Sequence, residues 1–192
     1  MPGKRATYFC VDIEANGPVP ALYDMVSCGI CAVHEEPEGW RSGASLYLEF
    51  RPEAPRTDPQ AEAIHGISRE HLLAHGVAHD EGCVRIADWV RAQTDPGSKP
   101  VFVGHNAPFD WSFIAWYFAA SGMDNPFGYK GFCTKSLAAG VLGLHWLDTD
   151  KENLAAALGM AEEDGALKHR ADYDARYQAA LLVRLLEKQR RG

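Results

Sequence analysis

The sequence predicts a single α/β domain built on a mixed β-sheet, and three observations lead to this fold class. Three strand-like segments lie in the first 50 residues, and the short turn-rich links between them favour an antiparallel meander. Strand-like and helix-like segments alternate in the second half of the chain, as they do in α/β proteins. The length of 192 residues fits one domain, residues 1–192, which is large enough to bury a core.

The expected strands follow from hydrophobic patterning between turn signals. The third strand shows this best, because Leu46, Leu48 and Phe50 alternate with the side chains of the other face. In chain order, strands are expected at residues 7–14, 25–34, 44–50 and 100–104, with a short one near residue 132.

The expected helices begin after a proline-rich connection at residues 52–59. Asn106 is expected to cap a helix that has Pro108 in its first turn, and Asp172 is expected to cap the last helix. Phe109 is expected to pack on the sheet with the other apolar residues of its helix. In chain order, helices are expected at residues 68–75 and 79–92, from 106, from about 136, at 151–158 and from about 172 to the end.

The charge of the chain does not select a partner. The net charge is −7, which argues against nucleic acid because basic residues supply most of that affinity. This objection weakens if several acids bind metal ions, because the ions cancel their negative charge. Basic residues also cluster locally. These are Lys130, Lys135, Lys168, Arg170, Arg184, Lys188, Arg190 and Arg191. The most apolar segment, residues 111–123, is too short to span a bilayer, so no membrane partner is expected.

Five cysteines are scattered along the chain. Cys28 and Cys31 have the spacing of half a zinc site, but they lie in an expected strand and there face opposite sides. We expect reduced, structural thiols and therefore a cytoplasmic protein.

The stretch FCVDIEANG, residues 9–17, places two carboxylates on one expected strand. Asp12 and Glu14 are two residues apart, so both side chains point to the same face. Like charges on a buried strand are costly unless a cation neutralises them, and carboxylate oxygens suit magnesium or manganese. The alternative is a strand whose second face is solvated.

A third acid follows the fourth expected strand in the stretch VGHNAPFDW, residues 103–111. Ligands of α/β proteins bind where a strand leads into a helix N-terminus, and Asp110 lies in the first turn of that helix. Taken alone, Asp110 is interpreted as an acid that stabilises the helix dipole.

The last expected helix opens in the stretch HRADYDA, residues 169–175. One row of its apolar residues is expected to be buried (Ala175, Ala179, Leu182, Leu186), with an adjoining row beside it (Leu181, Leu185). Asp174 lies at the start of the second row and therefore faces inward. His169 would point away from Asp174 on a continuous helix, so it is expected in the preceding loop. Taken alone, it reads as a surface histidine.

Together, the three stretches resemble the exonuclease motifs of the DEDDh superfamily, in the same order and spacing over residues 9–175. The resemblance implies a ribonuclease H-like fold with a mixed five-stranded sheet flanked by helices. It implies that two divalent cations, Mg²⁺ or Mn²⁺, are bound by the four acids (Asp12, Glu14, Asp110, Asp174). It gives His169 the role of general base, which suits a side chain that exchanges protons near neutral pH.

The resemblance also implies a substrate and a reaction. The enzyme would hydrolyse phosphodiester bonds at the 3′ end of single-stranded RNA or DNA, with RNA slightly favoured, and release nucleoside 5′-monophosphates. The backbone of Ala15, Asn16 and Gly17 would hold the terminal nucleotide, and His65 would stack on its base. An ordinary turn at His65 is equally expected.

Three alternatives remain open at this stage. A stand-alone enzyme is favoured over a proofreading subunit of a DNA polymerase, because the chain has no polymerase domain. A non-catalytic nucleic-acid-binding module is disfavoured, because none of the four acids or the histidine is missing. A homodimer is one expected form.

Overall fold

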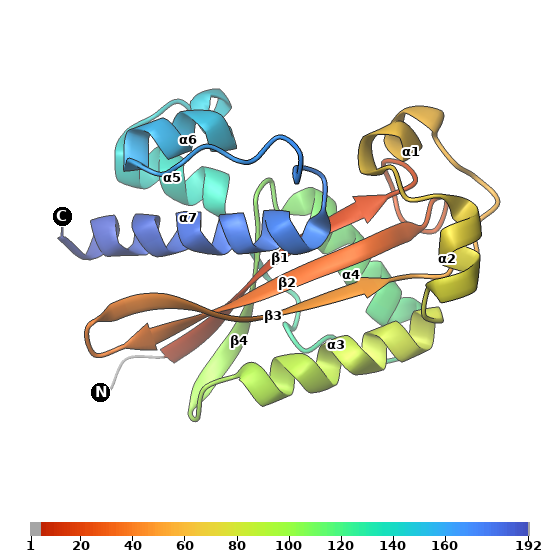
Figure 1. Ribbon diagram of the computed structural model, residues 1–192. Helices are drawn as coiled ribbons and strands as arrows, with labels where there is room; N and C mark the ends of the chain where they lie inside the picture. Colours follow the sequence, from red (N-terminus) through yellow and green to blue (C-terminus); the bar gives the residue numbers. More distant parts are fainter. Residues whose placement is uncertain (1–4, 192) are drawn as a thin grey trace.

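The computed structural model describes residues 5–191. These residues form one mixed five-stranded sheet, as the family resemblance implies, and the structure gives its strand order as β3-β2-β1-β4-β5 (Figure 1). β1 pairs antiparallel with β2, which pairs antiparallel with β3, whereas β4 is parallel to β1 and β5 is parallel to β4. The strands are β1 (Arg5–Ala15), β2 (Met25–Glu36), β3 (Gly39–Glu49), β4 (Ser98–Gly104) and β5 (Gly131–Cys133).

Helices cover both faces of this sheet. α7 lies along one face, α3 and α4 pack on the opposite face, and α5 and α6 pack against α7 (Figure 1). The helices are α1 (Pro59–His65), α2 (Arg69–His75), α3 (His79–Gln93), α4 (Pro108–Ala120), α5 (Thr134–Leu142), α6 (Lys151–Leu158) and α7 (Ala171–Arg191), with a 3₁₀ turn at Trp146–Asp148. No helix among residues 5–191 is both long and apolar enough to cross a membrane.

The alternation of side chains along β1 separates two cores. Phe9 and Val11 are fully buried in the core shared with α3 and α4, whereas Cys10 is fully buried in the core shared with α7. Asp12 and Glu14 continue the Cys10 side of the strand. Both carboxylates therefore face the layer that contains α7.

The apolar rows of α7 are buried as predicted. The first row packs on the sheet and the second row packs on α5 and α6 (Ala175, Ala179, Leu182 and Leu186; Leu181 and Leu185). Asp174 stands beside them with only 3% of its surface exposed. Two packed sides hold this helix in place, and they fix the position of the carboxylate at its start.

The approach of α7 to the sheet depends on a glycine. Gly29 of β2 is the register partner of Asp12, and a Cβ on Gly29 would overlap the backbone carbonyl of Ala171. Only glycine allows the first turn of α7 to lie this close to β2. That close approach brings Asp174 near the carboxylates of β1.

Three expectations about the helices were wrong. The proline-rich connection contains helix α1, which the sequence reading missed although Asp58 caps it and Pro59 opens it. Asn106 is not a cap, because its φ of 67° is left-handed and α4 begins after Ala107. α7 begins at Ala171, so Asp172 lies inside the helix and pairs with Arg176 instead of capping it.

All five cysteines are free. Cys28 lies in the core shared with α3 and α4, and Cys31 lies in the core shared with α7. The two side chains therefore face opposite sides of β2, as expected, and do not form half of a metal site.

Candidate active site

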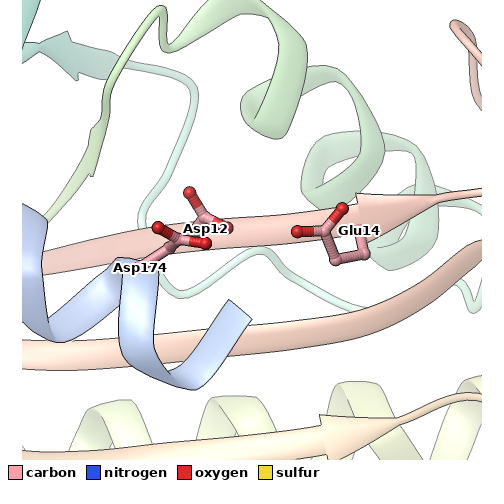
Figure 2. A group of neighbouring side chains, drawn as sticks. All are labelled: Asp12, Glu14 and Asp174. Carbon is pink, nitrogen blue, oxygen red and sulfur yellow. The ribbon is translucent and has the colours of Figure 1, made fainter. Parts of the chain in front are cut away.

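Three carboxylates converge between β1 and the first turn of α7. One oxygen from each of Asp12, Glu14 and Asp174 lies within 4.8 Å of the others, and Figure 2 shows the three side chains approaching one another from the two elements. The register of β1 against β2 shifts between Glu14 and Ala15, at the end of this part of the strand. Residues 12 and 174 are distant in sequence, so this cluster depends on the packing of α7.

Asp110 joins the same region from the other side. It lies in the first turn of α4, it is 6% exposed, and its Oδ1 accepts a hydrogen bond from the Ile13 N–H over 3.1 Å. Ile13 stands between Asp12 and Glu14, so this bond ties the helix to β1 at the level of the two acids. The expected position of Asp110 in the first turn of a helix is confirmed.

Burial disfavours the ionised forms of Asp12, Glu14 and Asp110. Burial and the neighbouring Asp110 raise the pKa of Asp12 well above its usual range. Burial and Asp174 raise the pKa of Glu14 to about 8, and burial raises the pKa of Asp110 to about 7. Repulsion between the acids thus contributes to the raised pKa values of Asp12 and Glu14, and a divalent cation would offset it.

The sequence reading missed a lysine at the centre of the cluster. Lys151 Nζ lies 3.0 Å from Asp174 Oδ1, 3.1 Å from Glu163 Oε1 and 4.0 Å from Asp12 Oδ1. Burial acts to lower the pKa of Lys151, but Asp12, Asp174 and Glu163 together raise it. One signal was available: Lys151 is the first residue of α6, where the helix dipole disfavours a cation.

His169 lies in the loop before α7, as predicted. Its φ of 66° is left-handed, and its backbone N–H donates to Asp174 Oδ2 over 2.8 Å. The residue is exposed and lines the same cleft as the acids. The imidazole is therefore accessible to a molecule that enters the cleft.

The cleft around the carboxylates has a volume of about 220 Å³. Phe109 lines it with 36% of its surface exposed, so the expectation that this ring packs on the sheet was wrong. The helix turn that directs Asp110 inward leaves Phe109 at the rim. The full lining is Asp12, Ile13, Glu14, His105, Asn106, Phe109, Asp110, Lys151, Lys168, His169 and Asp174.

His105 is a second residue that the sequence reading missed. The Thr134 hydroxyl donates to the Gly104 carbonyl over 3.3 Å, so it accepts from His105 Nδ1–H over 2.8 Å. Burial, together with Lys151 and Lys135, lowers the pKa of His105 to about 4. The neutral ring thus has an acceptor at Nε2, which is buried and has no hydrogen-bond partner within residues 5–191.

The residues predicted to bind the terminal nucleotide form a separate corner after β1. Ile67 N–H donates to His65 Nδ1, so His65 Nε2 carries the proton and donates to Asn16 Oδ1 over 3.2 Å. The backbone N–H and C=O of Asn16 are bonded to Asp24 and Asp58. The structure brings His65 to Asn16, but neither they nor Ala15 and Gly17 line the cleft described above. Their role stays a prediction.

The donor set fits a hard divalent cation. The three clustered groups offer only carboxylate oxygens, which magnesium and manganese prefer. Burial and repulsion between neighbouring acids raise the pKa of Asp12 and of Glu14, and a bound cation would offset the repulsion. Lys151 already contacts Asp12 and Asp174.

Known proteins resemble the whole chain. The 3′–5′ DNA exonuclease Cap18 of Escherichia coli is 36% identical over 188 residues, which cover 98% of this chain and 95% of that protein. Ribonuclease T of Salmonella choleraesuis (strain SC-B67) is 29% identical over 94% of this chain and 85% of its own length. The nuclease domain of 3′hExo, a DEDDh family member bound to rAMP, aligns with a TM-score of 0.77 at 15% identity, over 95% of this chain and 92% of that domain. No family model matches the chain.

Proposed function

The chain belongs to the DEDDh family of 3′–5′ exonucleases, and from this premise we propose that it removes nucleotides from the 3′ end of single-stranded DNA with two divalent cations, Mg²⁺ or Mn²⁺. The observation that carries the proposal is the convergence of Asp12, Glu14 and Asp174 within 4.8 Å, with Asp110 in the same cleft. These are the four acids of the family motifs, and they come from three separate elements.

The proposed chemistry assigns a task to each group. When bound, two divalent cations lower the pKa of an attacking water and stabilise the oxygen that leaves phosphorus. Asp12, Glu14 and Asp174 would hold these ions directly, and the Ile13 N–H would keep Asp110 in position beside them. His169, exposed at the cleft, would take the proton of the attacking water.

The rim of the cleft offers a contact for a base. Phe109 is exposed beside Asp110, and its ring packs on Phe113 with the centroids 5.4 Å apart, so it is supported from below. Exposed aromatic rings bind unpaired bases by stacking, without reading their sequence. We propose that Phe109 stacks on a nucleotide near the 3′ end.

The relatives favour DNA, with RNA as a second candidate. The protein that is 36% identical is a DNA exonuclease, and this outweighs the slight preference for RNA expected from the sequence alone. Ribonuclease T, at 29% identity over 94% of the chain, is the observation that favours RNA. Service to a polymerase as a proofreading subunit stays an untested alternative.

A digestion experiment tests the proposal. Matched single-stranded DNA and RNA oligonucleotides, labelled at the 5′ end, are incubated with Mg²⁺, with Mn²⁺ or with chelator. We expect stepwise shortening of DNA from the 3′ end, block by a 3′-phosphate, no effect of a 5′ block, and no activity in chelator or with Asp12→Asn. Cleavage of circular single strands or full activity in excess chelator contradicts the proposal. Faster digestion of RNA than of DNA would make RNA the substrate in place of DNA.

We also propose a location and an oligomeric state. We propose a cytoplasmic location, because the five cysteine thiols are free and the cytoplasm keeps thiols reduced. A homodimer stays a prediction, which analytical ultracentrifugation of the full chain tests.

A further inference from the structure

We propose that Lys151 is a built-in counter-cation of the carboxylate cluster, and that Glu163 retains Lys151 when a divalent ion displaces it from Asp174. The proposal rests on the proposed function in one respect, namely that the cluster binds divalent ions. It adds two residues outside the family motifs and assigns them opposite effects on metal affinity.

The first step is the position of the ammonium group. Asp174 Oδ2 accepts the backbone N–H of His169 over 2.8 Å, which leaves Oδ1 as the freer oxygen for a cation. Lys151 Nζ occupies that position, 3.0 Å from Oδ1, and lies 4.0 Å from Asp12 Oδ1 as well. The lysine therefore contacts two of the three acids that would hold an ion.

The second step is competition. A divalent ion bound to Asp174 would meet the ammonium across the same oxygen, and like charges at this range repel strongly in a buried site. Without an ion, the ammonium offsets part of the negative charge of the cluster, and the side chain of Lys151 is only 15% exposed. Lys151 thus stabilises the metal-free protein and weakens metal binding by the same contact.

The third step is the role of Glu163. Its side chain is 4% exposed, it lies in the connection between α6 and α7, and its Oε1 contacts Lys151 Nζ over 3.1 Å. Glu163 Oε2 is buried, has no hydrogen-bond partner in the described part of the chain, and lies 4.0 Å from Lys168 Nζ. The desolvation of this buried carboxylate offsets part of the stability gained from its ion pairs.

Glu163 remains an ion-pair partner for Lys151 after the lysine is displaced from Asp174. The existing contact of 3.1 Å means that Lys151 can lose Asp174 and still be paired with a carboxylate. Without Glu163, the ammonium would have Asp174 and Asp12 as its remaining partners and would compete harder for them. Glu163 is therefore expected to favour metal binding through Lys151, and to have little effect once the lysine is absent.

The test is a double-mutant cycle on the full chain, read out as Mn²⁺ affinity by calorimetry and as thermal stability without metal. Lys151→Met is expected to tighten Mn²⁺ binding by roughly tenfold and to lower the metal-free melting temperature. Glu163→Gln is expected to weaken Mn²⁺ binding by several-fold. In the double variant, the effect of Glu163→Gln on affinity is expected to disappear.

A matched control separates this contact from a general loss of charge. Lys135 is also buried, but its Nζ pairs with Asp150 Oδ1 over 2.7 Å. Lys135→Met removes the same charge from a different carboxylate and is expected to change Mn²⁺ affinity less than Lys151→Met does. Equal effects of the two lysine variants contradict the proposal.

The outcomes also separate this proposal from the function. A wild-type chain that binds no Mn²⁺ overturns the proposed function itself. A wild-type chain that binds Mn²⁺, together with unchanged affinity in Lys151→Met or a Glu163→Gln effect that persists without the lysine, overturns only the present proposal. Should Lys151→Met unfold without metal, Mn²⁺ is expected to refold it, and failure of that rescue also contradicts the proposal.

Discussion

The backbone N–H of His169 donates to Asp174 Oδ2 over 2.8 Å, so the loop that carries the histidine is held by the helix that carries the acid. The bond uses the main chain of His169 and leaves its imidazole free. Changes to the imidazole can therefore be separated from changes to the position of Asp174.

His169→Asn is expected to reduce turnover by about 10²–10⁴-fold while metal affinity stays at the wild-type level. Asparagine tolerates the left-handed φ of 66° at this position, so the backbone bond to Asp174 is kept. Single-turnover kinetics with saturating Mn²⁺, together with calorimetry, measure both effects. Wild-type turnover in this variant would make His169 an ordinary loop residue.

Asp174→Asn and Asp172→Asn are expected to behave differently although the residues lie two positions apart on α7. The first removes a clustered carboxylate, so Mn²⁺ affinity should fall by at least about tenfold and turnover should be lost. The second removes the ion pairs of Asp172 with Arg176 and Arg170, both partly exposed, and it should change stability by about 1 kcal/mol and retain activity. Equal loss of metal binding in the two variants would contradict the assignment of Asp174.

Gly29→Ala is expected to destabilise the protein by about 1–3 kcal/mol and to weaken metal binding. The new Cβ would overlap the Ala171 carbonyl and push the first turn of α7 away from β2. Gly140→Ala is the matched control, because Gly140 lies within α5 and a Cβ there meets nothing within 4 Å. That variant should be more stable than wild type by about 0.5–1 kcal/mol. Denaturant unfolding without metal compares the two, and a neutral Gly29→Ala would show that the close approach is not required.

The stability of the wild-type protein should depend on His105 at mildly acidic pH. The pKa of His105 is lowered to about 4 by burial, Lys151 and Lys135, so the unfolded chain binds this proton first as the pH falls below the usual range of histidine. Between pH 7 and pH 5, His105 should therefore cost the folded state about 2 kcal/mol.

His105→Asn isolates this contribution. The asparagine amide keeps a donor for the Thr134 hydroxyl but does not titrate. The variant should lose less stability than wild type over the same pH interval, as measured by denaturant unfolding at each pH. Parallel losses in the two proteins would show that His105 does not contribute.

The strands and the long helix could be predicted from the sequence because each follows a local period. The alternation along β1 determines that Asp12 and Glu14 share a face, and the two apolar rows of α7 determine that Asp174 points inward. The position of His169 before the helix follows from the same periodicity. Each of these properties follows from the pattern within one segment, so it can be predicted without the tertiary structure.

Other features have no local signature. The left-handed φ of Asn106 displaced the expected cap, and the rim position of Phe109 follows from how α4 meets the sheet. Helix α1 carried an Asp-Pro start, but its seven residues are too few to show a clear period. Short elements and turns depend on their neighbours more than on their own pattern.

The sequence by itself determined the order of the five strands and of the longer helices, the faces of Asp12, Glu14 and Asp174, and the resemblance to a nuclease family. Only the tertiary structure decided which side chains share the cleft, above all that Lys151 and Glu163 reach Asp174. Lys151 lies at the start of α6 and Glu163 lies in the connection that follows this helix. No pattern in either stretch predicts that the two side chains are in contact. Their contact arises because α6 packs against α7, and the energy of such an ion pair depends on burial that exists only in the folded chain.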